Sequence, residues 1–156
     1  MNVRRVLFVC LGNICRSPLV EAVARKHLDE AGLDVSVASC GTGGWHTGEG
    51  ADRRMIAAAR VAGHDLSAHC ARQLNARDFD DYDLLLAMDR ANLRELRQHA
   101  PNRELAAKAV LFLEWSAAAP PVEFPDPWHG DAAGFAAAVA LAERSVAGFV
   151  ARLRTA

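Results

Sequence analysis

The stretch Val6-Leu7-Phe8-Val9-Cys10-Leu11-Gly12-Asn13-Ile14-Cys15-Arg16-Ser17-Pro18 is the part of this chain that decides its fold. Its first four residues are apolar and rich in β-branched and aromatic side chains, which predicts a fully buried strand over Val6–Val9. Ser17-Pro18 is typical of a helix start, with Ser at the N-cap and Pro at the first helical position. Glu21 would then fall in the first turn, where a carboxylate suits the helix dipole. We therefore expect a loop that runs from a buried strand into a helix N-terminus, a site that favours anions.

Cys10 and Arg16 stand at the two ends of this loop with the spacing Cys-x5-Arg. The thiolate is the reactive form of cysteine, and a helix N-terminus together with a guanidinium favours that form. The same backbone donors can hold phosphoryl oxygens, two of which fit the planar fork of Arg16. Ser17 can donate a hydrogen bond to the sulfur and stabilise it as a leaving group. The loop thus predicts a nucleophile for phosphorus and a cysteinyl-phosphate intermediate. The alternative is a buried structural cysteine beside a surface arginine.

Length and composition indicate one globular domain over residues 1–156, large enough to bury a core without disulfides or metals. The net charge of −1 gives no global field for nucleic acid or an anionic membrane. The four cysteines show no zinc spacing, and we expect neither a metal nor an organic cofactor. Ala132–Ala142 is apolar but too short to span a bilayer, and Val6–Leu11 is too short for a signal peptide. A reduced thiol suits the cytoplasm, which is the expected location.

Further along the chain, strand and helix patterns alternate. Strands are expected at Val6–Val9, Val35–Ala38, Tyr82–Met88 and Lys108–Leu113. Helices are expected from Ser17-Pro18 to near Ala31, at Ala51–Ala62, near Asn75, at Asn92–His99 and at Asp131–Leu153. This alternation predicts an α/β fold, a three-layer sandwich with a four-stranded parallel sheet and flavodoxin-like or Rossmann-like topology. Ligands of such sheets bind beyond the carboxyl ends of the strands, where the first loop would lie.

The segment Pro125-Asp126-Pro127-Trp128-His129 holds the best candidate for an acid that protonates a leaving oxygen. Prolines on both sides of Asp126 restrict the backbone and could present the carboxyl group toward the first loop. Asp beside Pro is also ordinary turn chemistry, and the local pattern alone favours that interpretation.

The run Val9-Cys10-Leu11-Gly12-Asn13-Ile14-Cys15-Arg16-Ser17-Pro18 closely resembles the signature loop of the low-molecular-weight protein tyrosine phosphatases, and the resemblance extends from Val6 to about Phe149. It implies hydrolysis of phosphotyrosine in proteins and of small aryl phosphates. Cys10 would be the nucleophile, Arg16 the phosphate ligand and Asp126 the general acid and then base. The loop residues Leu11, Gly12, Asn13, Ile14, Cys15 and Ser17 would cradle the phosphate, and inorganic phosphate or other oxyanions would bind there as inhibitors.

Trp45 and Trp128 are aromatic residues on otherwise polar loops. Such residues mark recognition surfaces about as often as they fold back onto a core. The resemblance implies that they line a deep cleft for a phenolic ring, in which phosphotyrosine reaches Cys10 and the shorter phosphoserine does not. The family often carries a second aromatic residue where this chain has His129, a difference that bears on substrate preference.

The resemblance also implies a hydrogen-bond network around Asn13, Ser17, Ser39 and His69 that supports the loop. Without it, Asn13 reads as a turn residue, Ser39 as a strand end and His69 as a core histidine. Arg72 and Asp89 are expected to form ion pairs or caps.

Cys15 is compatible with two roles. It could form a reversible disulfide with Cys10 that protects the nucleophile from irreversible oxidation, or it could be a small core side chain. The resemblance favours the redox role. Cys40 and Cys70 carry no partner spacing and are expected to fill space.

Two other functions remain as alternatives. A thiol-dependent arsenate reductase of the same fold needs further cysteines after the third strand, and residues 82–100 contain none. A non-catalytic phosphate-binding module would lack the nucleophile or the acid, whereas Cys10 and Asp126 are both present. The enzyme is therefore the preferred interpretation.

Overall fold

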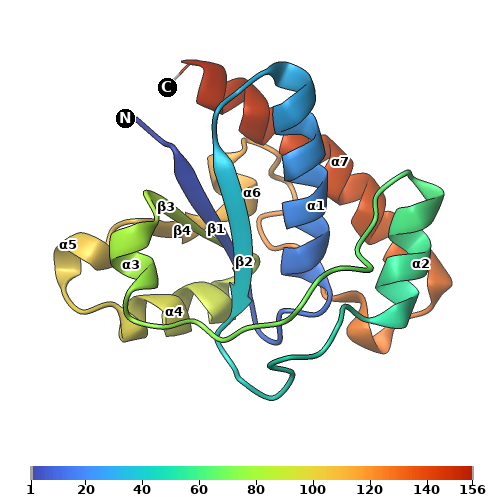
Figure 1. Cartoon of the computed structure of the whole chain (residues 1–156), viewed down its shortest axis with the longest axis horizontal. Helices are drawn as coiled ribbons and strands as arrows, with labels where there is room; N and C mark the ends of the chain where they lie inside the picture. Colours follow the sequence, from blue (N-terminus) through green and yellow to red (C-terminus); the bar gives the residue numbers. More distant parts are fainter. Residues whose placement is uncertain (1, 156) are drawn as a thin grey trace.

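Four short parallel strands form one sheet in the computed structural model, which describes residues 2–155 (Figure 1). Their spatial order is β2-β1-β3-β4, and every neighbouring pair is parallel. Val6 pairs with Val37 on one side and with Leu84 on the other, so β1 lies inside the sheet. The strands are β1 (Arg5–Cys10), β2 (Ser36–Gly41), β3 (Leu84–Ala87) and β4 (Ala109–Leu111). The predicted α/β fold with a four-stranded parallel sheet is confirmed.

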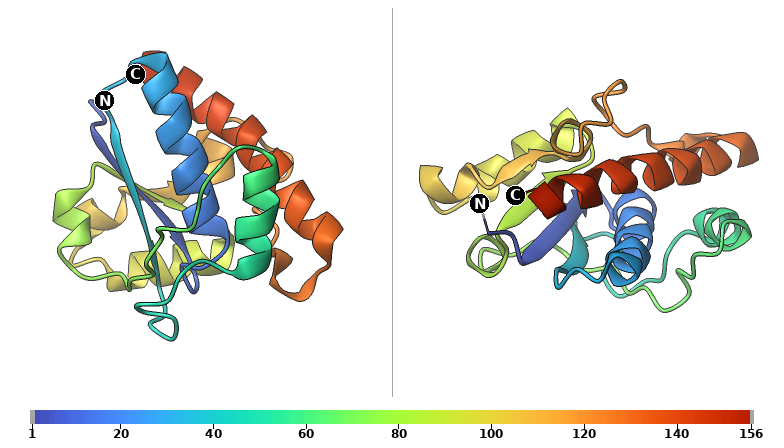
Figure 2. Two further views of the ribbon diagram at one scale, coloured as in Figure 1. Left: turned by 45° about the vertical axis from the view of Figure 1, so that its right-hand side comes forward. Right: turned by 90° about the horizontal axis from the view of Figure 1, so that it is seen from above.

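Helices cover both faces of the sheet. Figures 1 and 2 show α1, α2 and α7 on one side and α3, α4 and α5 on the other. Because successive strand residues point to opposite faces, Val6 and Phe8 join the core under α1 and α7, while Leu7 and Val9 join a second core on the opposite face. The helices are α1 (Arg16–Ala31), α2 (Arg53–Val61), α3 (Asp78–Asp81), α4 (Arg90–His99), α5 (Arg103–Ala106), α6 (Phe112–Trp115), η1 (Pro127–His129, a 3₁₀ turn) and α7 (Ala132–Thr155).

The start of α1 differs from the prediction. Cys15 occupies the N-cap position and the helix begins at Arg16, so Ser17 lies inside the first turn. The Ser17 hydroxyl does not cap the helix because it is directed at the sulfur of Cys10, 2.9 Å away. Glu21 therefore lies beyond the first turn, and the prediction that it stabilises the helix dipole there was wrong. In the described part of the chain no side chain caps this N-terminus, which leaves its N–H groups available to an anion.

The last strand is shorter than predicted. β4 ends at Leu111, and the chain turns at once into α6, whose Phe112, Leu113 and Trp115 are buried. A short apolar run is buried in either conformation, so its hydrophobicity alone does not distinguish strand from helix. The helix expected near Asn75 is α3, at Asp78–Asp81, whereas α5, α6 and η1 were not predicted.

The C-terminal helix α7 closely matches the helix predicted over Asp131–Leu153, although the sequence analysis weighed only its apolar run Ala132–Ala142 as a membrane span. By length and composition alone, its 24 residues are enough to cross a membrane. Half of its most apolar window is buried inside the fold, however, as in a core helix. Phe149 on this helix packs edge-to-face on Phe8 of β1, with ring centroids 5.6 Å apart. α7 thus anchors the face of the sheet that also carries α1.

Glu143 joins three segments of this layer. Its carboxylate contacts Nε2 of His64, which follows α2, and lies 3.3 Å from Nε2 of His27 on α1. His64 is almost fully buried, whereas Glu143 is partly exposed. Burial by itself would raise the pKa of Glu143, but the hydrogen bonds and charges of His64 and His27 hold that pKa below its usual value.

Replacing Glu143 with Gln should lower the free energy of unfolding at neutral pH and matter progressively less in acid. A carboxyl group with a depressed folded-state pKa stabilises the fold above its unfolded pKa of about 4.3 and loses that contribution as the pH falls through the folded value. Urea denaturation between neutral pH and about pH 3 measures this. Glu30→Gln, an exposed change on α1, is the control. Equal destabilisation by Glu143→Gln across the whole range would contradict the assignment.

Candidate active site

A cleft of about 260 Å³ opens beyond the carboxyl ends of the strands. Cys10 ends β1, and the segment 11–15 (hereafter the phosphate loop) leads from it into α1. The cleft thus lies where the fold class predicted a ligand site. Its lining is made of Cys10, Leu11, Gly12, Ile14, Cys15, Arg16, Trp45, His46, Asp126, Trp128 and His129.

The sulfur of Cys10 is held by two hydrogen-bonding groups. The backbone N–H of Asn13 donates to it at 3.3 Å, and the Ser17 hydroxyl lies 2.9 Å away. Ser17 Oγ also accepts a hydrogen bond from Asn13 Nδ2, and an amide nitrogen can only donate. The hydroxyl proton is therefore free for the sulfur, which is much closer than its other acceptor, the Cys40 carbonyl at 3.5 Å. Both groups are therefore placed to donate to the sulfur.

Asn13 is the centre of the loop's support. It is fully buried and has φ of 59°, the left-handed conformation that Asn tolerates better than most residues. Its Nδ2 donates to Ser17 and to Ser39, each at 2.9 Å. Ser39 in turn donates to Glu21 Oε1 at 2.6 Å, a contact that the sequence analysis missed. The expected cluster is therefore present in space, with Glu21 as an additional member.

Two residues of the segment after α2, His69 and Arg72, also hydrogen-bond to Asn13. His69 Nε2 donates to the Asn13 carbonyl at 2.6 Å, which requires the proton on Nε2, and the Arg72 N–H donates to Asn13 Oδ1 at 3.0 Å. Arg72 also forms a bidentate ion pair with Asp78, at 2.9 and 3.0 Å, which anchors the segment. The expected supporting roles of His69 and Arg72 are consistent with these contacts.

Gly41 allows the phosphate loop to lie against the end of β2. A Cβ atom at this position would be 2.6 Å from the Leu11 carbonyl oxygen and 3.1 Å from the Asn13 nitrogen, both of them backbone atoms. Without a side chain there, the backbone after β2 lies directly against the phosphate loop. The N–H groups of Thr42 and Gly43 donate to the carbonyls of Cys10 and Leu11. Any side chain at position 41 would displace the loop, a constraint that no sequence motif indicated.

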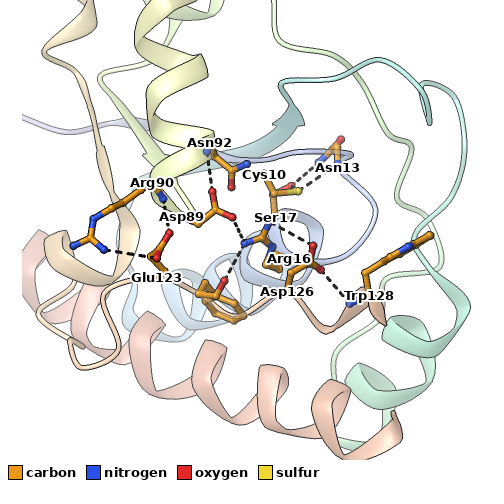
Figure 3. Close-up of polar contacts among 11 residues, drawn as sticks. Cys10, Asn13, Arg16, Ser17, Asp89, Arg90, Asn92, Glu123, Asp126 and Trp128 are labelled. Carbon is orange, nitrogen blue, oxygen red and sulfur yellow. Dashed lines mark hydrogen bonds and ion pairs between the residues drawn. The ribbon is translucent and has the colours of Figure 1, made fainter. Parts of the chain in front are cut away.

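Two hydrogen bonds from one nitrogen of its guanidinium orient the Arg16 side chain. Nη1 donates to Asp89 Oδ2 at 2.8 Å and to the Phe124 carbonyl at 2.9 Å, and the side chain is only 5% exposed (Figure 3). Asp89 is itself fixed as the N-cap of α4, where it accepts from the Asn92 N–H. Because Nη1 is occupied, Nη2 and Nε remain for an anion in the cleft.

Asp126 faces Arg16 across the cleft. Its Oδ2 lies 3.8 Å from Arg16 Nη2, and its Oδ1 accepts from the Trp128 N–H at 3.1 Å (Figure 3). The carboxyl group is 47% exposed, so a substrate can reach it. The backbone N–H of Arg90, at the start of α4, donates to Glu123 Oε2 at 2.9 Å, which ties this loop to α4.

Aromatic rings form the rim of the cleft. Trp45 is 72% exposed and Trp128 is 37% exposed, whereas Cys10 at the base is 3% exposed. His129 also lines the cleft, and so does His46, which sequence reasoning missed and which packs on Trp128 with ring centroids 6.0 Å apart. Thus the nucleophile candidate is recessed below aromatic walls.

The four cysteines differ in environment. Burial, reinforced by the negative charges of Asp52 and Asp126, raises the pKa of the Cys15 thiol to about 12. Burial also raises the pKa of Cys40. Cys70 is exposed, contrary to the expectation that it fills space. Within residues 2–155, no group of three or more His, Cys, Asp or Glu side chains is placed to hold a metal ion.

Comparison with known proteins gives one consistent result. Residues 5–156 match the family model described as low molecular weight phosphotyrosine protein phosphatase. A low molecular weight protein-tyrosine-phosphatase of Streptomyces coelicolor is 43% identical over 96% of this chain and 93% of that protein. A low molecular weight phosphotyrosine protein phosphatase of Schizosaccharomyces pombe is 41% identical over 84% of this chain and 85% of that protein.

Solved structures agree with these relatives. A protein tyrosine phosphatase from Entamoeba histolytica, crystallised with Hepes in its active site, superposes with a TM-score of 0.91 at 31% identity, covering 97% of both chains. Vibrio vulnificus Wzb in complex with benzylphosphonate superposes with a TM-score of 0.85 at 31% identity, covering 97% of this chain and 99% of that one. Both structures hold a ligand with a tetrahedral oxyanion group.

Proposed function

The chain belongs to the low molecular weight phosphotyrosine protein phosphatase family, and we propose that it hydrolyses phosphotyrosine in proteins, and small aryl phosphates, through a cysteinyl-phosphate. One observation carries the proposal. The Cys10 sulfur, the free end of the Arg16 guanidinium and the Asp126 carboxyl group converge on the same cleft.

The phosphate loop would hold the phosphoryl group. Its backbone N–H groups and the uncapped N-terminus of α1 suit the equatorial oxygens, and Arg16 Nη2 and Nε would complete the ring of donors. Since Asp89 and the Phe124 carbonyl already fix the guanidinium, little reorganisation is needed when charge develops in the transition state. Such preorganised stabilisation is the largest contribution that this site makes to the rate.

In the first step, the Cys10 thiolate attacks phosphorus and the bond to the phenolic oxygen breaks. Protonated Asp126 gives its proton to that oxygen, and the phenol leaves. The Ser17 hydroxyl, 2.9 Å from the sulfur, stabilises the thiolate before attack and again when it departs. In the second step, Asp126 takes a proton from water, whose oxygen attacks phosphorus and releases phosphate from the Cys10 sulfur. The enzyme is thereby returned to its starting state.

The recessed nucleophile supports a preference for phosphotyrosine. A substrate must pass the exposed rings of Trp45 and Trp128 to reach Cys10. A phenyl ring spans this depth and packs on the rim, whereas the shorter side chain of phosphoserine leaves its phosphate above the loop. His129 would provide a polar wall where the family often has a second aromatic ring.

We also propose that Cys15 protects the nucleophile. Peroxide would oxidise the Cys10 thiolate to a sulfenic acid, and Cys15 would then displace water to give a disulfide that two external thiols reduce. The raised pKa of Cys15 keeps this thiol protonated, so Cys10 would react first. Such chemistry suits a reducing compartment, and we place the enzyme in the cytoplasm as one phosphatase domain over residues 1–156.

The two alternatives have less support. Relay of a disulfide in an arsenate reductase needs two further cysteines in the segment after the third strand, and residues 82–100 contain none. A binding module has no need of a carboxylic acid facing the anion site, where Asp126 lies close to Arg16.

The reduced protein should hydrolyse p-nitrophenyl phosphate and a phosphotyrosine peptide with a metal chelator present, and Cys10→Ser should abolish both activities. A serine hydroxyl is a far weaker nucleophile than a thiolate at neutral pH. Circular dichroism would check that the variant folds. Cys70→Ser, which removes the exposed thiol, is the matched control and should keep normal turnover. Appreciable turnover by Cys10→Ser, or inactive reduced wild type, would contradict the proposal.

Asp126→Ala should slow poor leaving groups much more than good ones. A general acid contributes roughly 10²–10⁴-fold when the leaving oxygen needs a proton, and far less when the phenol is already acidic. The measurement is kcat/KM across a series of aryl phosphates that differ in phenol pKa. Asp29→Ala, which removes an exposed carboxyl group near the end of α1, serves as control. Equal losses for all leaving groups would count against the acid role of Asp126.

A further inference from the structure

The turn that carries Asp126 needs an anchor. Asp126 is half exposed, and its own side chain contacts only the Trp128 N–H and, at 3.8 Å, the Arg16 guanidinium among the described residues. The location of its carboxyl group therefore depends on what holds the turn Pro127–His129. Within this turn Pro127 is buried, and Trp128 is the residue whose large side chain reaches across to another element.

Arg54 of α2 meets Trp128 on that side. Its guanidinium carbon lies 5.3 Å from the centroid of the Trp128 ring and 4.7 Å from that of Phe135. Phe135 belongs to the first turns of α7 and is 1% exposed. A cation placed over two aromatic faces is attracted to both, so Arg54 joins the partly exposed wall of the cleft to a fixed ring of the core.

Asp52 fixes the direction of Arg54. Its two carboxylate oxygens accept from Arg54 Nε at 3.2 Å and from Nη2 at 3.0 Å, a bidentate pair in a planar geometry. The same carboxylate accepts from the N–H groups of Arg54 and Met55, and so caps α2. The pair holds the pKa of Asp52 below its ordinary value despite partial burial, which on its own would raise it.

The backbone of Asp52 reaches the phosphate loop. Its N–H donates to the carbonyl of Ile14 at 2.8 Å. A continuous series of contacts thus runs from Ile14 through Asp52 and Arg54 to Trp128, whose N–H binds Asp126. The two halves of the reaction centre, the phosphate loop and the turn with the acid, are connected through α2.

We propose that Arg54 is a positioning residue that sets the Asp126 carboxyl group relative to the phosphate loop by its cation–π contact with Trp128. The inference rests on the proposed role of Asp126 as general acid. Without the guanidinium, Trp128 loses its link to α2, and the acid spends less time at the leaving oxygen. The nucleophile and the phosphate donors remain in place because Asn13, Ser39 and His69 hold them independently of Arg54.

The test compares Arg54→Met with Arg54→Lys and with Arg53→Met. Methionine keeps the length and apolar contact of the side chain but removes the cation, and lysine restores it. Arg53 is the neighbouring exposed arginine of α2, and its side chain forms no hydrogen bond or ion pair among residues 2–155, so Arg53→Met is the matched control. The readout is kcat/KM for a phenyl phosphate and for an aryl phosphate with a strongly acidic phenol.

Arg54→Met should lose about tenfold or more with the phenyl phosphate and less than about threefold with the acidic phenol, as expected when only part of the contribution of a general acid is lost. Arg54→Lys should recover part of the loss, and Arg53→Met should match wild type. In the double variant Arg54→Met/Asp126→Ala, the Arg54→Met change should add little to the loss of kcat/KM caused by Asp126→Ala, because both changes act on the same step. The intrinsic tryptophan fluorescence of the protein, to which Trp128 contributes, should also change in Arg54→Met.

The outcomes separate the inference from its premise. If Asp126→Ala shows leaving-group dependence but Arg54→Met slows both substrates equally, Arg54 is merely structural and the inference is overturned. The same conclusion follows if Arg54→Met matches wild type. If Asp126→Ala itself lacks leaving-group dependence, the proposed acid role fails first and takes the inference with it.

Discussion

The hydrogen bonds of the buried Asn13 side chain are the interaction on which the site depends. They hold a left-handed backbone residue inside the phosphate loop and connect it to α1 through Ser17, to β2 through Ser39 and to the segment after α2 through Arg72. A buried amide that lost these partners would carry the full cost of desolvation, about 1–3 kcal/mol for each unsatisfied group. The network therefore fixes the conformation of the loop, and its last member, the Ser17 hydroxyl, reaches the Cys10 sulfur. Fold stability and the reactivity of the nucleophile are connected through the same few atoms.

The rest of the catalytic apparatus is arranged around that fixed loop. Arg16 leaves the loop as the first residue of α1 and is oriented by Asp89 from the N-terminus of α4 and by the Phe124 carbonyl. The proposed acid, Asp126, comes from the long connection before α7, more than a hundred residues later in the sequence. It is joined to the loop through Asp52 and Arg54 of α2. A half-exposed carboxyl group is thereby held near a recessed anion site, which is the geometry that the proposed acid catalysis requires.

Local sequence patterns predicted the parts of this architecture that local physics determines. The buried run Val6–Val9 and the Gly-Asn turn that follows gave the central strand and the loop, and the alternation of elements gave a parallel sheet. The family resemblance, not spacing, brought Ser39, His69 and Asp126 to the site. What the sequence did not reveal depends on three-dimensional contacts. Ser17 was predicted both as a helix cap and as a donor to the Cys10 sulfur, and only its three-dimensional contacts show that it serves the second role without the first. The need for glycine at position 41 arises only where β2 meets the loop. Glu21, His46 and Arg54 act on residues distant in the sequence, so no periodicity or motif identified them.

The central claim is that phosphate passes through the sulfur of Cys10. The most direct measurement is rapid quenching of the reaction with a phosphotyrosine peptide, followed by mass spectrometric mapping of the phosphoryl group on the denatured protein. The Asp126→Ala variant with p-nitrophenyl phosphate is the companion experiment, because this leaving group needs no acid while loss of the base that activates water should slow breakdown of the intermediate. The account predicts a phosphoryl group on Cys10, formed at the rate at which the dephosphorylated peptide is released in the first turnover. A phosphoryl group on any other residue, or release of product with none on the protein, would contradict it.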